Sequence, residues 1–422
     1  MRQTIIEKIF SEHSGTMVKA GDVAIANIDF CFATDFTGDS AINSFRSLGI
    51  DSIYSKSKIG MFLDHYAPCP DIKSANTHKK MRFFAKEFGT QIFDVDCGIS
   101  HEILTEIGAV TAGDIILGAD SRVYTYGALN ALGISVGATD LAISMSSGKN
   151  WFRVPESIKI IINGKLPLGV FAKDVILHII GDIGKGGAHY QAVEFYGDVI
   201  DEMSIEERFI ITNMAEELGA KCAIMNADKK TIAWLKNANA REPKTFSADD
   251  KPRYLEIREY TMSDLGPQVA FMDETKYKVV DIAEVEGKNI NAVYIGGCVN
   301  GKFEDIELAA KILKGKKISK DLKLIITPAS SKIYMKCLKK GIIASLLETG
   351  AIINNAGCGP CSGLHEGIPY NEEIIFTTTA RTLESGLGNN AGKVYLGSVA
   401  TAAGTALTGK ISDPREYRRK LI

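Results

Sequence analysis

The sequence has almost no net charge, little proline and no long hydrophobic run. Its 49 Lys and Arg residues nearly balance 51 Asp and Glu residues, which leaves a formal net charge of -2 over 422 residues. A dedicated nucleic-acid binder needs a basic surface, so we expect no nucleic-acid partner and favour small neutral or anionic ligands. With only 11 prolines and no Pro- or Ser-rich stretch, the chain offers no Pro/Ser-rich linker.

The sequence also lacks the patterns of a membrane span and of a secretory signal. The first ten residues include Arg2, Glu7 and Lys8 and have no continuous apolar core. The longest charge-free run in the middle of the chain, residues 123–139, is rich in Gly, Thr, Ser and Asn, so we expect a buried, turn-rich segment. We therefore expect a cytoplasmic protein without membrane contact, whose eight cysteines serve metals or catalysis and do not form a disulfide scaffold.

Short β-branched runs alternate with helical patterns along most of the chain, which predicts an α/β fold with helices on both faces of its sheets. The clearest stretch is a strand at 293–295, a helix over 303–314 and a strand at 322–327, which together make a βαβ unit. The pattern continues to the end as a doubly wound domain. The length allows two to four domains, and we predict three, with approximate bounds 1–150, 151–285 and 286–422.

Three local patterns carry further predictions. Residues 158–162, an Asn-Gly pair and residues 168–171 predict a β-hairpin. A helix is expected over 204–218, because the periodic run begins at a serine and ends before a glycine. The polar stretch 236–253 is the best candidate for a mobile connection.

Three of the eight cysteines stand out because each lies in a Gly-flanked turn that follows a predicted strand. Cys298 lies in Gly-Gly-Cys-Val-Asn-Gly, and Cys358 and Cys361 lie in Gly-Cys-Gly-Pro-Cys-Ser-Gly. Loops at the carboxyl ends of strands are where open α/β sheets bind ligands, so these thiols predict a three-point metal site. The remaining cysteines are interpreted as small buried hydrophobes: Cys31, Cys69, Cys97, Cys222 and Cys337.

Spacing alone leaves several readings of this cysteine set open. A redox Cys-x-x-Cys would be expected to open a helix after the first strand of a thioredoxin-like unit, and this pair does not. His365, four residues after Cys361, would complete a Cys3His zinc site. Three thiolates can equally hold a 4Fe-4S cluster with one iron open to substrate, and a purely structural set of thiols is the remaining possibility.

Ordered motifs along nearly the whole chain decide between these readings, because the sequence resembles the aconitase superfamily of iron-sulfur hydro-lyases, in particular large subunits of the 3-isopropylmalate dehydratase and homoaconitase type. The motifs that carry the resemblance are Gly-Ala-Asp-Ser (118–121), Thr-Tyr-Gly-Ala-Leu (125–129), Lys-Asp-Val-Ile-Leu (173–177), Asn-Met-Ala-Glu-Glu-Leu-Gly-Ala (213–220), Gly-Cys-Val-Asn-Gly (297–301) and the cysteine pair. The resemblance implies aconitase-like three-layer α/β/α domains. It also implies a 4Fe-4S cluster on Cys298, Cys358 and Cys361.

The resemblance also implies a reaction, the reversible removal of water from a 2-hydroxy acid, and the residues that carry it. Asp64 and His65 match the family's Asp-His pair near the leaving hydroxyl, His101 matches a second imidazole, and Asp120 matches its carboxylate partner. Without the family, a histidine beside an aspartate is more often a satisfied polar pair, and Asp120 could simply cap a turn.

Further family positions fall on Asn213, Glu217 and Arg381. Asn213 and Glu217 are four apart on the predicted helix and so share a face, and Arg381 matches an arginine that clamps a substrate carboxylate. Taken alone, the first two are typical of a solvated helix face and the arginine of a surface charge.

The sequence departs from the family pattern at the expected site. The family's Asp-Ser-His-Thr is Asp-Ser-Arg-Val here, so Arg122, which cannot release a proton, replaces a histidine. If Arg122 faces Glu217, the two form a fixed ion pair, and we count Arg122 with Arg381 and Asn213 as candidate substrate-binding residues. Ala380 and Gly386 replace an asparagine and the second of two arginines. These changes point to a smaller or differently placed substrate group, or to lost activity.

The sequence contains no Gly-Ser-Ser-Arg segment, which in full aconitases supplies the serine base and another arginine. The resemblance therefore implies a separate small subunit that brings the base. Our first hypothesis is a large subunit acting on isopropylmalate, in leucine biosynthesis. Homocitrate, dimethylmalate or citramalate are the alternative substrates. A catalytically impaired paralogue that binds the cluster is the non-enzymatic alternative.

Overall fold

The first part of the chain forms a five-stranded parallel sheet. The structure, a computed structural model, describes residues 2–363, 365–380 and 392–421. The strand order is β4-β3-β2-β5-β6, and the strands are β2 (Phe30–Thr34), β3 (Ile59–Phe62), β4 (Gln91–Phe93), β5 (Ile115–Gly118) and β6 (Leu132–Ser135). The chain builds β3 and β4 on one side of β2 and then returns to build β5 and β6 on the other. The carboxyl ends of β2 and β5 are therefore the switch point where such a sheet binds ligands.

A second, four-stranded parallel sheet has the order β10-β9-β8-β11. Its strands are β8 (Ser157–Asn163), β9 (Ala192–Tyr196), β10 (Cys222–Met225) and β11 (Glu256–Thr261). A separate two-stranded ribbon joins β1 (Val23–Asn27) to β7 (Lys149–Arg153) in antiparallel register.

The third sheet has seven strands in the order β13-β12-β18-β17-β14-β15-β16. These are β12 (Gln268–Asp273), β13 (Lys276–Asp281), β14 (Ala292–Gly296), β15 (Lys323–Thr327), β16 (Ile352–Ile353), β17 (Ile375–Thr377) and β18 (Val394–Leu396). It is parallel from β18 to β16, and an antiparallel hairpin of β12 and β13 extends one edge. Its switch point lies between β14 and β17, directly before Cys298.

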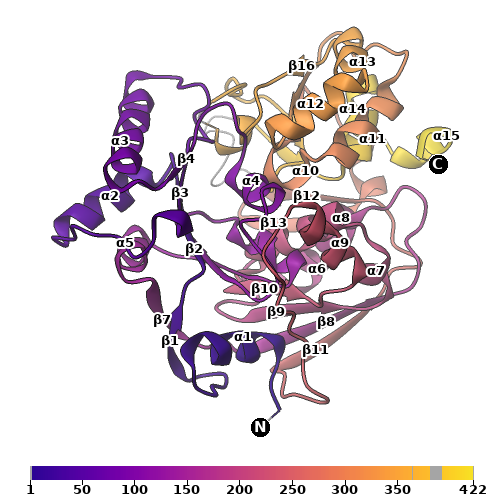
Figure 1. Cartoon of the computed structure of the whole chain (residues 1–422). Coiled ribbons are helices and arrows are strands. Elements are labelled where there is room, and N and C mark those ends of the chain that lie inside the picture. Colours follow the sequence, from indigo (N-terminus) through magenta and orange to yellow (C-terminus); the bar gives the residue numbers. More distant parts are fainter. Residues whose placement is uncertain (1, 364, 381–391, 422) are drawn as a thin grey trace.

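Helices cover these sheets (Figure 1). Those associated with the first sheet are α1 (Ile5–Ser14), α2 (Gly38–Ser47), α3 (Ile72–Phe88), α4 (Ser100–Glu106) and α5 (Ala138–Ser147). The middle of the chain adds α6 (Ala172–Ile183), α7 (Asp198–Glu202), α8 (Ile205–Met214) and α9 (Lys229–Asn237). The last part adds α10 (Gly297–Asn300), α11 (Phe303–Leu313), α12 (Ser331–Lys339), α13 (Ile342–Thr349), α14 (Val399–Thr408) and α15 (Arg418–Leu421).

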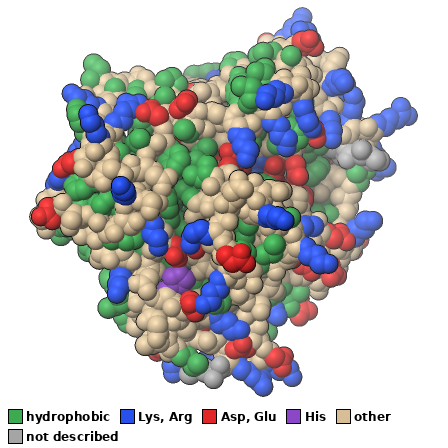
Figure 2. Space-filling model, in the orientation of Figure 1, with side chains coloured by type: hydrophobic (Ala, Val, Ile, Leu, Met, Phe, Trp, Pro, Cys, Tyr) green, Lys and Arg blue, Asp and Glu red, His purple; other side chains and the backbone are tan. Residues whose placement is uncertain are grey.

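The predicted α/β class is confirmed, and so is the βαβ unit formed by β14, α11 and β15. The charge-free run 123–139 is buried and turn-rich, as expected. Among the described residues, no helix is long and apolar enough to cross a membrane. Lysine and arginine side chains are interspersed with acidic ones on the face seen in Figure 2, as the near-zero net charge implies. The division into three domains stays a prediction.

Two local predictions were wrong. Residues 168–171 form no strand, because β8 pairs in parallel with β9 and β11 on both sides and residue 172 already begins α6. The polar stretch 236–253 is held against the first sheet region. There the amide of Lys244 donates to the carbonyl of Ala112, and Asn130 exchanges hydrogen bonds with the backbone of Phe246.

Candidate functional site

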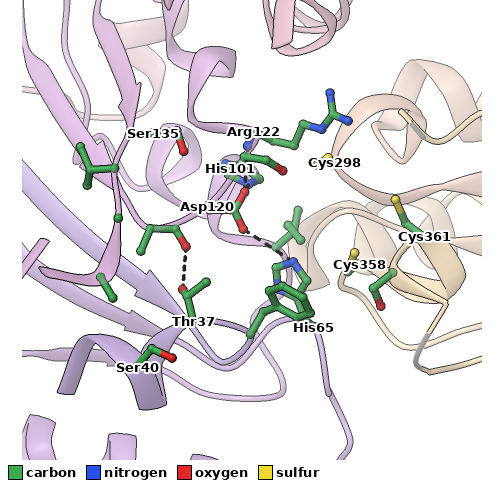
Figure 3. A pocket seen from close by; sticks show the side chains of 18 residues that line it. Thr37, Ser40, His65, His101, Asp120, Arg122, Ser135, Cys298, Cys358 and Cys361 are labelled. Atoms are coloured by element: carbon green, nitrogen blue, oxygen red, sulfur yellow. Dashed lines mark hydrogen bonds and ion pairs between the residues drawn. The ribbon is translucent and has the colours of Figure 1, made fainter. Parts of the chain in front are cut away.

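A cavity of about 310 Å³ lies where the first and third sheets meet. One wall comes from the loops after β2, β3 and β5 and from the start of α4, and the opposite wall carries the three cysteines (Figure 3). The residues that matter most for its chemistry are Thr37, His65, His101, Asp120, Arg122 and the three cysteines. The chain thus brings two switch-point edges together around one space.

His65 enters this cavity from the loop that follows β3. Its Nδ1 donates to Asp64 Oδ1 at 2.7 Å, and the other oxygen of Asp64 accepts the backbone amide of Ser100 at 2.8 Å. Burial alone would lower the pKa of His65, but the charges of Asp64 and neighbouring groups outweigh it and raise that pKa well above the usual value. These contacts orient the ring, with Nε2 directed toward Asp120, 3.6 Å from its Oδ2.

His101 and Asp120 form a second imidazole–carboxylate pair. His101, in α4, donates from Nε2 to Asp120 Oδ1 at 2.9 Å, and the same oxygen accepts the backbone amide of Arg122 at 2.8 Å. Burial would raise the pKa of Asp120, but His101 and His65 hold it well below its usual range. Asp120 is therefore an ionised carboxylate shared by two histidines, as the sequence predicted for His101.

Arg122 pairs with acidic side chains in the 3-10 turn Ala215–Leu218, which follows α8. Its Nη2 donates to Glu217 Oε1 at 2.5 Å, and Nη1 lies 3.1 Å from Glu216 Oε2. Burial would lower the pKa of the guanidinium, but both carboxylates raise it well above its ordinary value. The expected Arg122–Glu217 ion pair is present. Of these residues, only Arg122 lines the cavity.

Asn213 lies on the cysteine side of this ion pair. It is fully buried, and its amide nitrogen donates to Thr125 Oγ1 at 2.8 Å and contacts Cys298 Sγ at 3.6 Å. Its Oδ1 has no hydrogen-bond partner. The solvated face that Asn213 and Glu217 would form in an ordinary helix is therefore absent, because both side chains are buried.

The three cysteines converge on the cavity from two turns. Cys298 is the second residue of the short helix α10, Cys358 directly precedes a 3-10 turn over Gly359–Ser362, and Cys361 lies within that turn. All three cysteines are buried. Gly296, before Cys298, has φ of 134°, and a Cβ at this position would lie 2.0 Å from the carbonyl oxygen of Thr327. Only glycine fits this close turn, which aims Cys298 into the cavity.

The thiols are not arranged for a single tetrahedral ion. Among the described residues, the group of three or more potential ligands with donor atoms within 4.8 Å of one another is Asp35, Asp64 and His65, and it includes no cysteine. Donors on one zinc ion lie about 3–4 Å apart, given zinc–ligand bonds of about 2.0–2.3 Å. His365 Nε2 lies 3.7 Å from Glu366 Oε1 and is not part of a compact set with the thiols. The Cys3His zinc arrangement is therefore not formed.

Arg381 and Gly386 lie outside the described residues, whereas Ala380, just before them, is buried. The segment leading to them is held by Lys173, whose Nζ donates to the carbonyls of Thr378 and Thr379 at 2.8 and 3.2 Å.

Sequence reasoning missed three residues beside the site: Asp35, Cys69 and His78. Asp35 Oδ1 accepts the backbone amide of His65 and Oδ2 accepts that of Tyr66, each at 2.9 Å, and His78 Nε2 donates to Oδ2 at 2.8 Å. Cys69, interpreted as a buried hydrophobe, is only half-buried and contacts His78 Nδ1 at 3.0 Å. One signal was available, because Asp35 directly follows the first strand of a doubly wound sheet, where ligand sites form.

These observations define a class of protein: an α/β fold in which thiols and imidazole–carboxylate pairs face one cavity. A family model described as the aconitase family (aconitate hydratase) matches residues 7–280 and 270–409. The chain therefore belongs to the aconitase family.

Curated relatives match along almost the entire chain. The chain is 44% identical over 421 residues to 3-isopropylmalate dehydratase large subunit 1 of Thermotoga maritima, covering 99% of this chain and 100% of the relative. It is 43% identical to the protein of the same description from Pyrococcus abyssi, covering 99% of both chains. It is 41% identical over 418 residues to that of Methanopyrus kandleri, covering 99% of this chain and 100% of the relative.

A solved structure, the holo-form of Thermococcus kodakaraensis aconitase X, shares the fold with a TM-score of 0.50. It is 12% identical, and the match covers 90% of this chain and 93% of that chain. The aconitase-like fold class predicted from the sequence is thus confirmed.

Proposed function

We propose that this chain is the large subunit of a hydro-lyase of the 3-isopropylmalate dehydratase type, which removes and returns water on a malate-like 2-hydroxy acid. The observation that carries the proposal is the cavity, where a histidine held by a carboxylate faces three buried thiols. Full-length relatives described as dehydratase large subunits support the same reaction.

The residues around the thiols fit a 4Fe-4S cluster held by Cys298, Cys358 and Cys361. Aconitase-family proteins bind an iron-sulfur cluster, and three thiols too widely spaced for one ion match a larger group. Two buried polar atoms nearby, Asn213 Oδ1 and Ser362 Oγ, have no hydrogen-bond partner. When bound, such a cluster supplies an open iron that acts as a Lewis acid toward the hydroxyl and a carboxylate of the substrate.

His65 is the residue we assign to the departing hydroxyl. Its raised pKa keeps a proton on Nε2, the nitrogen that is free to face substrate, while Asp64 holds Nδ1. Proton donation from a positioned imidazole to a leaving oxygen is worth about 10²–10⁴ in rate. His101 and Asp120 support this step because Asp120, ionised and 3.6 Å from His65, stabilises the charged ring.

We assign substrate binding to Arg122, Asn213 and Arg381. Arg122 lines the cavity and carries a permanent charge, which suits a substrate carboxylate better than an imidazole would. Glu217 fixes that guanidinium, and Asn213 contacts the sulfur of Cys298. Arg381 is proposed as the second carboxylate clamp on the basis of the sequence match alone.

The proton next to the carboxylate is taken, in this proposal, by a serine on a separate small subunit in the cytoplasm. The description of the relatives as large subunits supports such a partner. No Gly-Ser-Ser-Arg segment occurs in this chain, so the base is expected from outside.

The test is turnover by the anaerobically reconstituted chain mixed with a small subunit from the same genome. Hydration of isopropylmaleate, or of dimethylmaleate or citraconate, should appear only with both chains and should fall about 10²–10⁴-fold in His65→Asn. An intact cluster with no turnover on any of these acids would overturn the proposal in favour of a catalytically impaired cluster-binding paralogue.

A further inference from the structure

A chain of three side chains leads from the protein surface to the backbone of His65. It begins at Cys69, in the loop between β3 and α3, where the thiol is half-buried. Cys69 Sγ lies 3.0 Å from His78 Nδ1, and His78 Nε2 lies 2.8 Å from Asp35 Oδ2. Asp35 in turn accepts the amides of His65 and Tyr66. None of Cys69, His78 and Asp35 lines the cavity. These three side chains can therefore affect the site only through the residues that they hold.

The direction of these hydrogen bonds follows from the chemistry of the groups. Burial would raise the pKa of Asp35, but hydrogen bonds from His65 and His78 hold it well below its usual range, so the carboxylate only accepts. His78 therefore carries its proton on Nε2. With the proton on Nε2, the Nδ1 atom that faces Cys69 is an acceptor, and it takes the S–H of Cys69.

The carboxylate of Asp35 accepts three hydrogen bonds, from the backbone amides of His65 and Tyr66 and from His78 Nε2. Its side chain is 2% exposed, and it fixes two consecutive amides of the loop that carries His65 while its Oδ1 also lies 3.5 Å from His65 Nδ1. A buried carboxylate with one donor removed would turn toward other donors or admit water. His78, itself 1% exposed on the inner face of α3, is the donor that prevents this.

We propose that His78 is a positioning residue for the reaction, acting through Asp35 to hold His65, with the Cys69 thiol selecting the tautomer of His78 that donates to Asp35. The inference rests on the proposed role of His65. A displacement of a catalytic group by about 1 Å can cost about 10²-fold in rate without weakening substrate binding. The chain of contacts therefore predicts an effect on kcat and none on KM.

The test uses paired variants of the cluster-loaded large subunit with its small partner. In Gln the amide nitrogen is as many bonds from Cβ as Nε2 is in His, so His78→Gln keeps the donor to Asp35, while His78→Leu removes it. His78→Leu should lower kcat about tenfold to a hundredfold with KM within about twofold, and His78→Gln should restore most of the loss. Cys69→Ser should behave as wild type, and Cys69→Ala should show a smaller fall in kcat.

A second readout is independent of turnover. Hydrogen exchange, followed by mass spectrometry of the peptide that contains residues 65 and 66, should accelerate in His78→Leu and remain slow in His78→Gln, because Asp35 accepts both amides. His13→Leu is the matched control, because His13 contacts Asp29 at 2.7 Å in the same kind of pair but lines no part of the cavity. It should change neither kcat nor this exchange.

Unchanged exchange in His78→Leu, or equal losses of kcat in His78→Leu and His13→Leu, would overturn the inference. A rise in KM at unchanged kcat would overturn it as well. If wild type failed to turn over every acid tried, the proposed function would fail, while the exchange data would still decide whether His78 holds residues 65 and 66.

Discussion

The guanidinium of Arg122 lies 2.5 Å from the carboxylate of Glu217, and both groups are almost fully buried beside the cavity that the three cysteines face. The pair occupies the position where the family pattern has a titratable histidine. An arginine keeps its charge throughout the physiological pH range, so a fixed guanidinium, paired with two carboxylates, stands beside the cavity.

Replacing Arg122 by histidine should therefore weaken substrate binding without restoring a faster reaction. We expect Arg122→His to raise KM about 10- to 100-fold, because a hydrogen bond to a charged group contributes about 1.5–3 kcal/mol. Arg122→Lys, which keeps the charge and loses the planar fork, should lie between wild type and Arg122→His. Steady-state kinetics with equal iron content in all three proteins measures this, and an unchanged KM in Arg122→His would contradict a binding role.

The three cysteines carry a separate prediction about metal content. Serine at Cys298, Cys358 or Cys361 should lower bound iron and sulfide by more than half after anaerobic reconstitution, because each thiolate is one of three protein ligands. Cys97→Ser is the control, since Cys97 is a half-buried free thiol that does not line the cavity. Iron and acid-labile sulfide analysis gives the result, and bound zinc without sulfide in wild type would contradict the cluster.

Much of the architecture could be predicted because short stretches of sequence indicate where its helices, strands and turns lie. The β14-α11-β15 unit follows from a β-branched run, an acidic first turn and a glycine after the helix, all within 40 residues. The hairpin after β8 was wrong because an Asn-Gly pair is a local turn signal, whereas the partners of β8 are strands that come 29 residues or more later in the chain. Pairing between strands that lie so far apart in the sequence is decided by packing, and a short stretch of sequence does not indicate it.

Residues of the site could be predicted only where they lie within a recognisable sequence motif. His65, His101 and the three cysteines stand in recognisable sequence surroundings, and the structure brings them to one cavity. Asp35 and His78 lie 43 residues apart, and their hydrogen bond depends on how α3 packs against β3 and β4 of the first sheet. No spacing rule links such positions, so a side chain that acts through another residue is found only from coordinates.

Glu106 predicts how stability depends on pH. Burial and the charge of Glu102 raise the pKa of Glu106 to about 7, while Ser330 donates to it at 2.7 Å. A carboxyl group whose folded pKa is raised contributes stability that is fully present below its unfolded pKa of about 4.3 and is lost as pH rises through about 7. Wild type should therefore lose free energy of unfolding between these values.

Glu106→Gln removes this dependence. Its gain over wild type should be small at pH 5, where most of this stability is still present, and should reach about 1–2 kcal/mol at pH 8, a figure reduced for partial exposure. Glu202→Gln, at an exposed position, is the control and should be neutral at both pH values. Chemical denaturation at pH 5 and pH 8 measures the difference, and a larger gain at pH 5 would reverse the sign and contradict the assignment.

The buried ion pair between Lys302 and Glu102 ties the two walls of the cavity together. Lys302 Nζ lies 2.5 Å from Glu102 Oε2, and both side chains are nearly inaccessible to water. Burial would lower the pKa of Lys302, but Glu102 raises it above its usual value, so the pair is charged. Glu102 belongs to α4, next to His101, and Lys302 precedes α11 and lies close to Cys298.

Removing one partner should therefore destabilise the protein more than removing both. Lys302→Met leaves a buried carboxylate without its cation and should cost about 3–5 kcal/mol of unfolding free energy. The double variant Lys302→Met, Glu102→Leu should recover most of this loss, because two apolar side chains need no desolvated charge. Lys80→Met, which breaks the exposed pair with Asp39, should cost less than about 1 kcal/mol. Additive losses in the double variant would show that packing, not the ion pair, joins the walls.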